Sequence, residues 1–142
     1  MMHVVYLSLG SNMGDRRRLM ERAIEEIEKQ IGHVVRQSAF YETEPWVFES
    51  PNLFLNAAVC VETELTPRQL LQMTQHIERS LGRRKNVNCN LSNRKYVDRP
   101  IDIDILLYDD LTVDEPDLKI PHPLMYEREF VMKPLREIME TP

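Results

Sequence analysis

Two aspartates, Asp102 and Asp104, are the residues of this chain whose type and spacing point most directly to chemistry. They lie within residues 99–108, where aliphatic residues recur with a period of two, as in a β-strand. The alternation predicts two faces of this strand, one with Ile101, Ile103, Ile105 and Leu107, the other with Asp102, Asp104, Leu106 and Tyr108. With Cα atoms about 7 Å apart, the carboxylates could bracket a pair of divalent cations, which lie about 3.5–4 Å apart in two-metal sites.

A cation would also offset the repulsion between two like charges beside a core. The alternative interpretation is that both aspartates face water on an edge strand, although aspartate is uncommon in ordinary strands.

Hydrophobic periodicity and turn residues predict the elements that must position this pair. The expected strands are residues 4–9, 34–41, 54–61 and 99–108. The expected helices are residues 16–31, 66–81 and 131–139, the second opened by a capping sequence and closed by a glycine. Gly10 is expected to open a plain strand-to-helix turn. The order β-α-β-β-α-β predicts an α+β domain with ferredoxin-like topology, an antiparallel sheet with helices packed on it.

Several polar residues stand where a purely structural element would not require them. Asn56 faces the interior from its strand and must find hydrogen-bond partners, which a ligand could supply. Gln75 and Glu78 flank the apolar stripe of the second helix. His122 stands between two prolines, in a rigid loop that is well suited to contact a ligand.

A long polar segment, residues 83–98, leads up to the paired aspartates. Together with Arg99 it contains six basic residues. Such a run is usually only a solvated face, but its position beside two carboxylates favours contact with phosphate. Because residues 84–98 are rich in asparagine and serine, we expect them to form a mobile lid that closes over a bound ligand.

Composition places further bounds on function. The chain has 142 residues, 42% hydrophobic and 29% charged, which predicts one domain over residues 1–142. A net charge of −5 argues against a protein that coats nucleic acid. No apolar run approaches a membrane span. Cys60 and Cys89 have neither metal-ligand nor disulfide spacing, so we expect a reducing compartment, the cytoplasm. We also expect a monomer.

Five groups of residues carry a resemblance to a known family. They are Leu9-Gly10-Ser11-Asn12, Tyr41-Glu42-Thr43, Phe54-Leu55-Asn56-Ala57-Ala58, Arg99-Pro100-Ile101-Asp102-Ile103-Asp104-Ile105-Leu106, and Pro121-His122-Pro123 through Arg128-Glu129-Phe130. Together they closely resemble the 6-hydroxymethyl-7,8-dihydropterin pyrophosphokinase family of folate biosynthesis. Its members transfer diphosphate from ATP to a pterin alcohol, release AMP and have the ferredoxin-like fold. The resemblance therefore implies an ATP- and Mg-dependent 2-amino-4-hydroxy-6-hydroxymethyldihydropteridine diphosphokinase.

The resemblance also implies a role for each matching residue. Asp102 and Asp104 match the carboxylates that hold two Mg²⁺ ions, and Arg83 and Arg99 match cations that act on the transferred group. The pterin would contact residues at one end of the sheet: Thr43, Glu44, Pro45, Trp46, Phe54, Asn56 and Phe130. ATP would contact a second set: Gln75, Glu78, Arg83, Lys95, Tyr96, Arg99, Ile105, His122 and Arg128.

The residues alone leave three alternatives open. A ferredoxin-like regulatory module would bind a small ligand without metal and would not need the aspartate pair. An RNA-binding sheet would require aromatic residues on its central strands and a basic face, and the sequence has neither. A DxD sugar-nucleotide transferase would require a longer chain.

Overall fold

The computed structural model describes residues 2–13, 15–43, 53–82 and 100–139. Its main sheet has five strands. Four of them run in the order β2 (Gly32–Gln37), β4 (Phe54–Thr63), β1 (His3–Ser11) and β5 (Asp102–Tyr108), and β3 (Tyr41–Thr43) also pairs with β4. The helices are α1 (Arg16–Gln30), α2 (Pro67–Ser80) and α3 (Glu129–Met139). A small hairpin, β6 (Val113–Glu115) and β7 (Leu118–Ile120), and a 3-10 helix (Met125–Glu127) connect β5 to α3.

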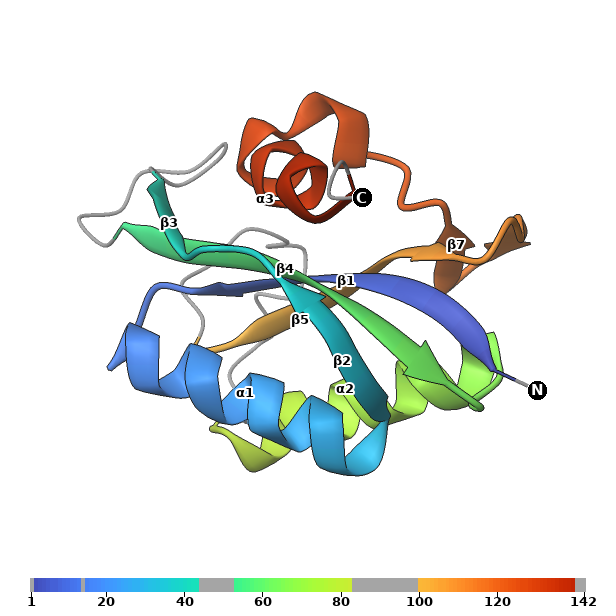
Figure 1. Cartoon of the computed structure of the whole chain (residues 1–142), viewed down its shortest axis with the longest axis horizontal. Coiled ribbons are helices and arrows are strands. Elements are labelled where there is room, and N and C mark those ends of the chain that lie inside the picture. Colours follow the sequence, from blue (N-terminus) through green and yellow to red (C-terminus); the bar gives the residue numbers. More distant parts are fainter. Residues whose placement is uncertain (1, 14, 44–52, 83–99, 140–142) are drawn as a thin grey trace.

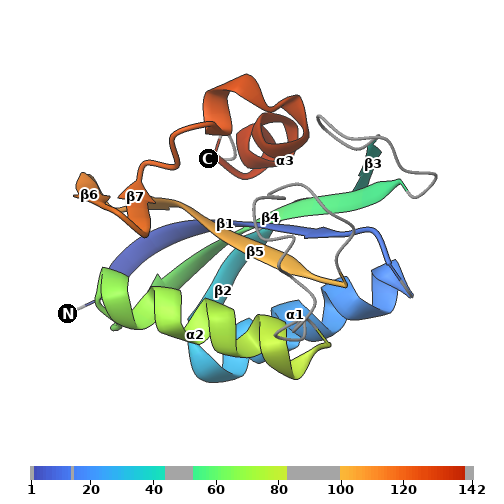
Figure 2. The same cartoon turned by 180° about the vertical axis from the view of Figure 1, so that it is seen from behind.

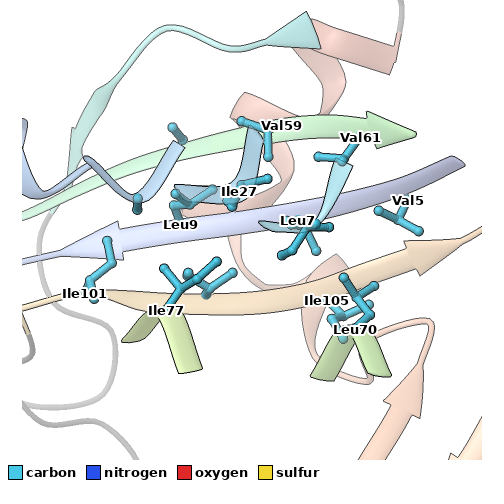
Figure 3. Packing of buried hydrophobic residues seen from close by; sticks show 14 of the residues in the cluster. Val5, Leu7, Leu9, Ile27, Val59, Val61, Leu70, Ile77, Ile101 and Ile105 are labelled. Atoms are coloured by element: carbon cyan, nitrogen blue, oxygen red, sulfur yellow. The ribbon is translucent and has the colours of Figure 1, made fainter. Parts of the chain in front are cut away.

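Helices α1 and α2 cover one face of the sheet, and α3 lies over the other (Figure 1 and Figure 2). The first face holds the main core, where apolar residues of β1, β4 and β5 meet Ile27 of α1 and Leu70 and Ile77 of α2 (Figure 3). All paired strands of the sheet are antiparallel. The expected βαββαβ order and ferredoxin-like α+β class are therefore confirmed, and the expected final helix is present as α3; β3 and the β6–β7 hairpin are additional strands.

Local signals in the sequence explain where the helices begin. The Asp15 side chain accepts the N–H of Arg18 at 3.2 Å and caps α1. Thr66 and Gln69 form the expected capping box at α2, each side chain bonded to the other's backbone N–H. Among the described residues, no helix is both long and apolar enough to cross a membrane.

The expected continuous strand over residues 34–41 was wrong. β2 ends at Gln37 and β3 begins at Tyr41 because Ser38 interrupts the ladder with its own side chain. The Ser38 N–H donates to the Ala58 carbonyl at 2.9 Å, and the Ser38 hydroxyl accepts the Ala58 N–H at 2.9 Å. A hydroxyl thus replaces a backbone carbonyl at this position, and the chain bends between the two strands.

The expected faces of Leu107 and Tyr108 were also wrong. Leu106 is an extra residue in β5, since Tyr6 pairs with Leu107 whereas Leu7 pairs with Ile105. Such a bulge reverses the alternation beyond it. Tyr108 consequently joins the main core with the isoleucines of β5, while Leu106 and Leu107 pack on the α3 side.

Replacing Ser38 by alanine should lower the free energy of unfolding by about 1–3 kcal/mol, because the buried Ala58 N–H loses its acceptor. Urea titration followed by circular dichroism measures this change. Ser80→Ala is the matched control, since that exposed hydroxyl only donates to the Ile77 carbonyl, and it should change stability by less than about 0.5 kcal/mol. Equal losses in the two variants would contradict the role given to Ser38.

Candidate active site

The two aspartates project from β5 to the face opposite α1 and α2. Their neighbours Ile101, Ile103 and Ile105 all lie in the main core, so the alternating positions 102 and 104 face the other way. Both aspartates are half-buried. Across the central strand, Asp102 pairs with Gly10 and Asp104 with Ser8. The predicted orientation of the carboxylate pair is therefore confirmed.

Glu78 holds the strand that carries this pair. Glu78 is 5% exposed, and its carboxylate accepts the N–H of Ile103, the residue between the aspartates, at 2.7 Å. Among the residues that the structure describes, β5 is the last strand of the sheet on this side, so its outward N–H groups face no further strand there. The side chain of α2 thus supplies the acceptor that a neighbouring strand would have supplied.

One row of residues crosses the sheet and joins two parts of the site. Gly10 pairs with Asn56 of β4 on one side and with Asp102 of β5 on the other, and Asn56 in turn pairs with Tyr41 of β3. Neighbouring strands lie about 4.8 Å apart, so Asn56 and Asp102 stand about 10 Å apart on opposite sides of Gly10. Asn56, predicted to bind the pterin, and Asp102, predicted to bind the metal, therefore flank the central strand in one row.

Gly10 also makes room for the Asn56 side chain. A Cβ atom added to Gly10 would lie 3.1 Å from the Asn56 side-chain oxygen and 3.7 Å from Phe54. Asn56 is itself fixed, because its amide donates to the Thr43 hydroxyl at 2.6 Å. The expected turn at Gly10 was wrong: β1 continues to Ser11, and Gly10 is a position of close packing inside the strand.

The small side chains on this face distinguish its two halves. Under α3, the sheet presents Tyr6, Cys60 and Leu106, which pack against Val131 and other apolar residues of the helix. Beside the aspartates, the central strand β1 presents Ser8 and Gly10, which pair with Asp104 and Asp102. Sequence reasoning missed this set of small residues, because only the strand register shows that they are neighbours.

His122 and Arg128 reach the site from the segment that leads into α3. The His122 N–H donates to the carbonyl of Leu106, the bulged residue, at 3.1 Å. Its ring Nδ1 accepts the N–H of Leu124 at 3.2 Å, so the neutral ring carries its proton on Nε2. Arg128 is 8% exposed, and its guanidinium lies 5.7 Å from the centroid of the Phe130 ring.

The electrostatics of His122 show that these groups lie close together. Burial lowers the pKa of His122 below its ordinary value, the positive charge of Arg128 lowers the pKa further, and the negative charge of Asp102 acts in the opposite direction. A depressed pKa keeps the ring neutral at pH 7, with one N–H to donate. His122, Arg128 and Asp102 are thus brought within electrostatic reach of one another from separate segments; their roles toward ATP and metal stay predictions.

The remaining predicted residues have different placements. Gln75 is exposed on α2, and Ile105 is 6% exposed in the main core. Their contacts with ATP stay predictions. The structure does not describe seven predicted site residues, together with the expected lid over residues 84–98: Glu44, Pro45, Trp46, Arg83, Lys95, Tyr96 and Arg99.

A metal site at Asp102 and Asp104 would draw few ligands from the protein. Within the described part of the chain, no group of at least three His, Cys, Asp or Glu side chains could hold a metal ion. Mg²⁺ usually keeps several waters and binds through one or two carboxylates together with substrate phosphates. Paired carboxylates therefore suit Mg²⁺ that arrives with a nucleotide.

A ferredoxin-like sheet with paired carboxylates, a histidine and a buried arginine on one face fits the class of nucleotide-dependent phosphotransferases. Comparison with known sequences gives the family. The model of the 7,8-dihydro-6-hydroxymethylpterin-pyrophosphokinase family matches residues 6–140, and this chain belongs to that family. The predicted family, fold and pyrophosphokinase activity in folate biosynthesis are thereby confirmed.

Individual relatives agree with this assignment. The chain is 50% identical over 138 residues to the 2-amino-4-hydroxy-6-hydroxymethyldihydropteridine pyrophosphokinase of Porphyromonas gingivalis, covering 96% of this chain and 91% of the relative. It is 39% identical over 141 residues to the enzyme of the same name from Bacillus subtilis, covering 99% and 80%.

Among solved structures, a variant of Plasmodium falciparum HPPK-DHPS with pterin and p-hydroxybenzoate superposes with a TM-score of 0.72 at 17% identity. The match covers 96% of this chain and 39% of that longer one. This likeness supports the fold.

The titration of His122 tests the assembled site. In the free protein its pKa should lie below 6.5, because the ring is buried beside Arg128. Arg128→Gln should raise this pKa and Asp102→Asn should lower it, since the two charges act in opposite directions. Two-dimensional NMR of the imidazole over a pH series measures all three values. Shifts of the same sign in both variants would contradict the arrangement.

Proposed function

We propose that Asp102 and Asp104 form the metal site at which this chain transfers diphosphate from ATP to 6-hydroxymethyl-7,8-dihydropterin and releases AMP. ATP dependence and a general requirement for Mg²⁺ follow from the family; the number of ions, two, belongs to the proposal. The observation that carries it is the pairing of Gly10 with both Asn56 and Asp102. This pairing places the side-chain amide proposed to hydrogen-bond the pterin one strand away from the carboxylate pair.

The carboxylates suit this role by their charge and their surroundings. Two half-buried carboxylates on one side of a strand repel each other, and a cation relieves that repulsion. Asp102 and Asp104 would hold Mg²⁺, whose positive charge would stabilise negative charge on phosphate and lower the pKa of the pterin hydroxymethyl group. Asp102 and Asp104 hold this charge in place, and Glu78 keeps their strand fixed through Ile103.

His122 and Arg128 serve the nucleotide side. The neutral His122 ring offers an N–H at Nε2, and Arg128 adds a positive charge, so both stabilise negative charge on phosphate oxygens. Phosphoryl transfer requires from the protein mainly positioning and charge stabilisation. No side chain has to act as a strong base at this site.

The pterin binds beside the central strand. We define the pterin site by its described residues, Thr43, Phe54, Asn56 and Phe130. Asn56, oriented by Thr43, reads the polar edge of the ring, while Phe54 and Phe130 stack on its faces. Gly10 matters here because any side chain would push against Asn56.

The chain acts in this proposal as a single-domain monomer in the cytoplasm. One sheet with its helices contains the described residues of both proposed sites, and the free thiol of Cys60 is buried among the apolar side chains under α3. Light scattering at several protein concentrations measures the oligomeric state, and a concentration-dependent dimer would contradict the monomer.

Replacing either aspartate by alanine should abolish turnover without unfolding the protein. Asp102→Ala and Asp104→Ala should each lower kcat at least about a hundredfold, because the remaining carboxylate holds Mg²⁺ poorly. The melting temperature should stay the same or rise, since a like-charge repulsion is removed. Release of AMP rather than ADP from ATP, Mg²⁺ and the pterin alcohol is the assay.

Asp110→Ala is the control, because Asp110 lies exposed in the turn after β5 and should retain full activity. Near-normal AMP release by either site variant at ordinary Mg²⁺ concentration would show that the aspartates are not the metal site.

Loss of either stacking ring should weaken pterin binding selectively. Phe54→Ala and Phe130→Ala should each cost about 1–3 kcal/mol of pterin binding free energy, the range for stacking on an aromatic side chain. Isothermal titration should find a much smaller change for ATP. Tyr126→Ala, which removes a ring that is 70% exposed, should leave both affinities unchanged. Equal losses for both ligands would indicate a damaged fold.

A further inference from the structure

An exposed carboxylate on α3 makes an unusual set of contacts. Both oxygens of Glu137 accept the backbone N–H of Ala39, at 3.3 and 3.1 Å. One of them also accepts the hydroxyl proton of Tyr41. That hydrogen bond, followed by burial, raises the pKa of Tyr41, so its hydroxyl stays protonated and donates. Glu137 therefore joins α3 to the segment between β2 and β3.

This segment leads directly into one wall of the pterin site. Tyr41 begins β3 and pairs with Asn56, and Thr43 ends β3 and pairs with Phe54. Thr43 also accepts the amide proton of Asn56. Any displacement of β3 would thus shift the side chains that are proposed to hydrogen-bond to the pterin ring and stack on it.

The other wall is carried by the same helix as Glu137. Phe130 lies near the start of α3, seven residues before Glu137, and residues with this spacing lie on the same side of a helix. Lys133 lies between them on that side, with its amino group 5.0 Å from the centroid of the Tyr41 ring. The side of α3 that bears Phe130 therefore faces β3.

The attachment of α3 to the sheet does not depend on Glu137. Val131, Leu135 and Ile138 are buried against the sheet, and Arg36 donates to the Ile138 carbonyl at 3.1 Å. Apolar packing fixes the distance of the helix from the sheet but is tolerant of small rotation and sliding. The directional bonds of Glu137 supply what this packing lacks, a fixed position of α3 relative to β3.

We propose that Glu137 is a positioning residue for the pterin, which holds Phe130 in register with Phe54 and Asn56 by tying α3 to Ala39 and Tyr41. The inference rests on the proposed pterin site and deepens it. Glu137 does not touch the substrate in this account. It acts through Phe130, and its removal should affect the pterin and spare ATP.

The experiment measures the dissociation constants of pterin and of ATP with Mg²⁺ by isothermal titration, with the full chain, well below its melting temperature. Glu137→Ala should weaken pterin binding about ten- to a hundredfold, as expected for a small misplacement of a binding group. Glu137→Gln keeps one acceptor oxygen and should give an intermediate value. ATP binding should change less than about twofold in both variants.

Arg136→Gln is the matched control. Arg136 neighbours Glu137, is exposed and pairs with Glu129 on the same helix, so its loss removes an ion pair of α3 without touching β3. Its pterin affinity should equal that of the unaltered chain. In a Phe130→Ala background, Glu137→Ala should have little further effect on pterin binding, because the group through which it acts is already absent.

The outcomes separate this inference from the proposed function. If the unaltered chain fails to bind pterin, or Phe54→Ala and Phe130→Ala bind it normally, the proposed site itself is wrong. If those variants lose binding and Glu137→Ala keeps it, only the positioning role is overturned. Equal losses of pterin and ATP affinity with Glu137→Ala would show that Glu137 only stabilises the fold, and would also overturn the role. The same conclusion would follow if the effects of Glu137→Ala and Phe130→Ala on pterin binding were fully additive.

Discussion

The antiparallel pairing of β1 with β4 on one side and β5 on the other is the constraint on which the rest of the structure depends. Because backbone hydrogen bonds allow only one register at a time, the pairing of Gly10 with both Asn56 and Asp102 determines which side chains stand next to one another. A slip of one residue would turn the carboxylates into the core and the isoleucines of β5 out of it. The apolar packing of α1 and α2 against the sheet strongly disfavours that slip.

The two faces of this sheet have different roles. One face is wholly committed to the core, with large aliphatic side chains from β1, β4 and β5. The other face is apolar under α3 and small and polar near the aspartates, so packing and chemistry occupy different halves. Polar groups near the site are held by direct bonds, as Glu78 holds Ile103 and Thr43 holds Asn56. Such satisfied buried polar groups orient the functional side chains without large stability costs.

Two irregularities of the strands have structural consequences. The bulge at Leu106 moves Tyr108 into the main core, where its hydroxyl donates to the Leu65 carbonyl, and the Leu106 carbonyl accepts the His122 N–H. The break at Ser38 bends the chain so that Ala39 meets Glu137 of α3. Each irregularity releases backbone groups from the ladder, and each released group is used to attach a segment that carries site residues.

From the sequence alone, the three helices, the strands β1, β4 and β5, the fold class and the paired carboxylates could be predicted, because periodicity and capping are local properties and the set of motifs is specific to one family. The sequence also indicated Asn56, His122 and Arg128 as candidate ligand-binding residues. The three-dimensional structure was needed to show that Gly10 lies between Asn56 and Asp102, that Leu106 reverses the pattern of β5 and that Ser38 divides a strand. It was also needed to show that Glu78 and Glu137 bond to backbone far away in the chain. These facts depend on which backbone N–H and C=O groups of distant segments meet, and side-chain periodicity contains no record of that register.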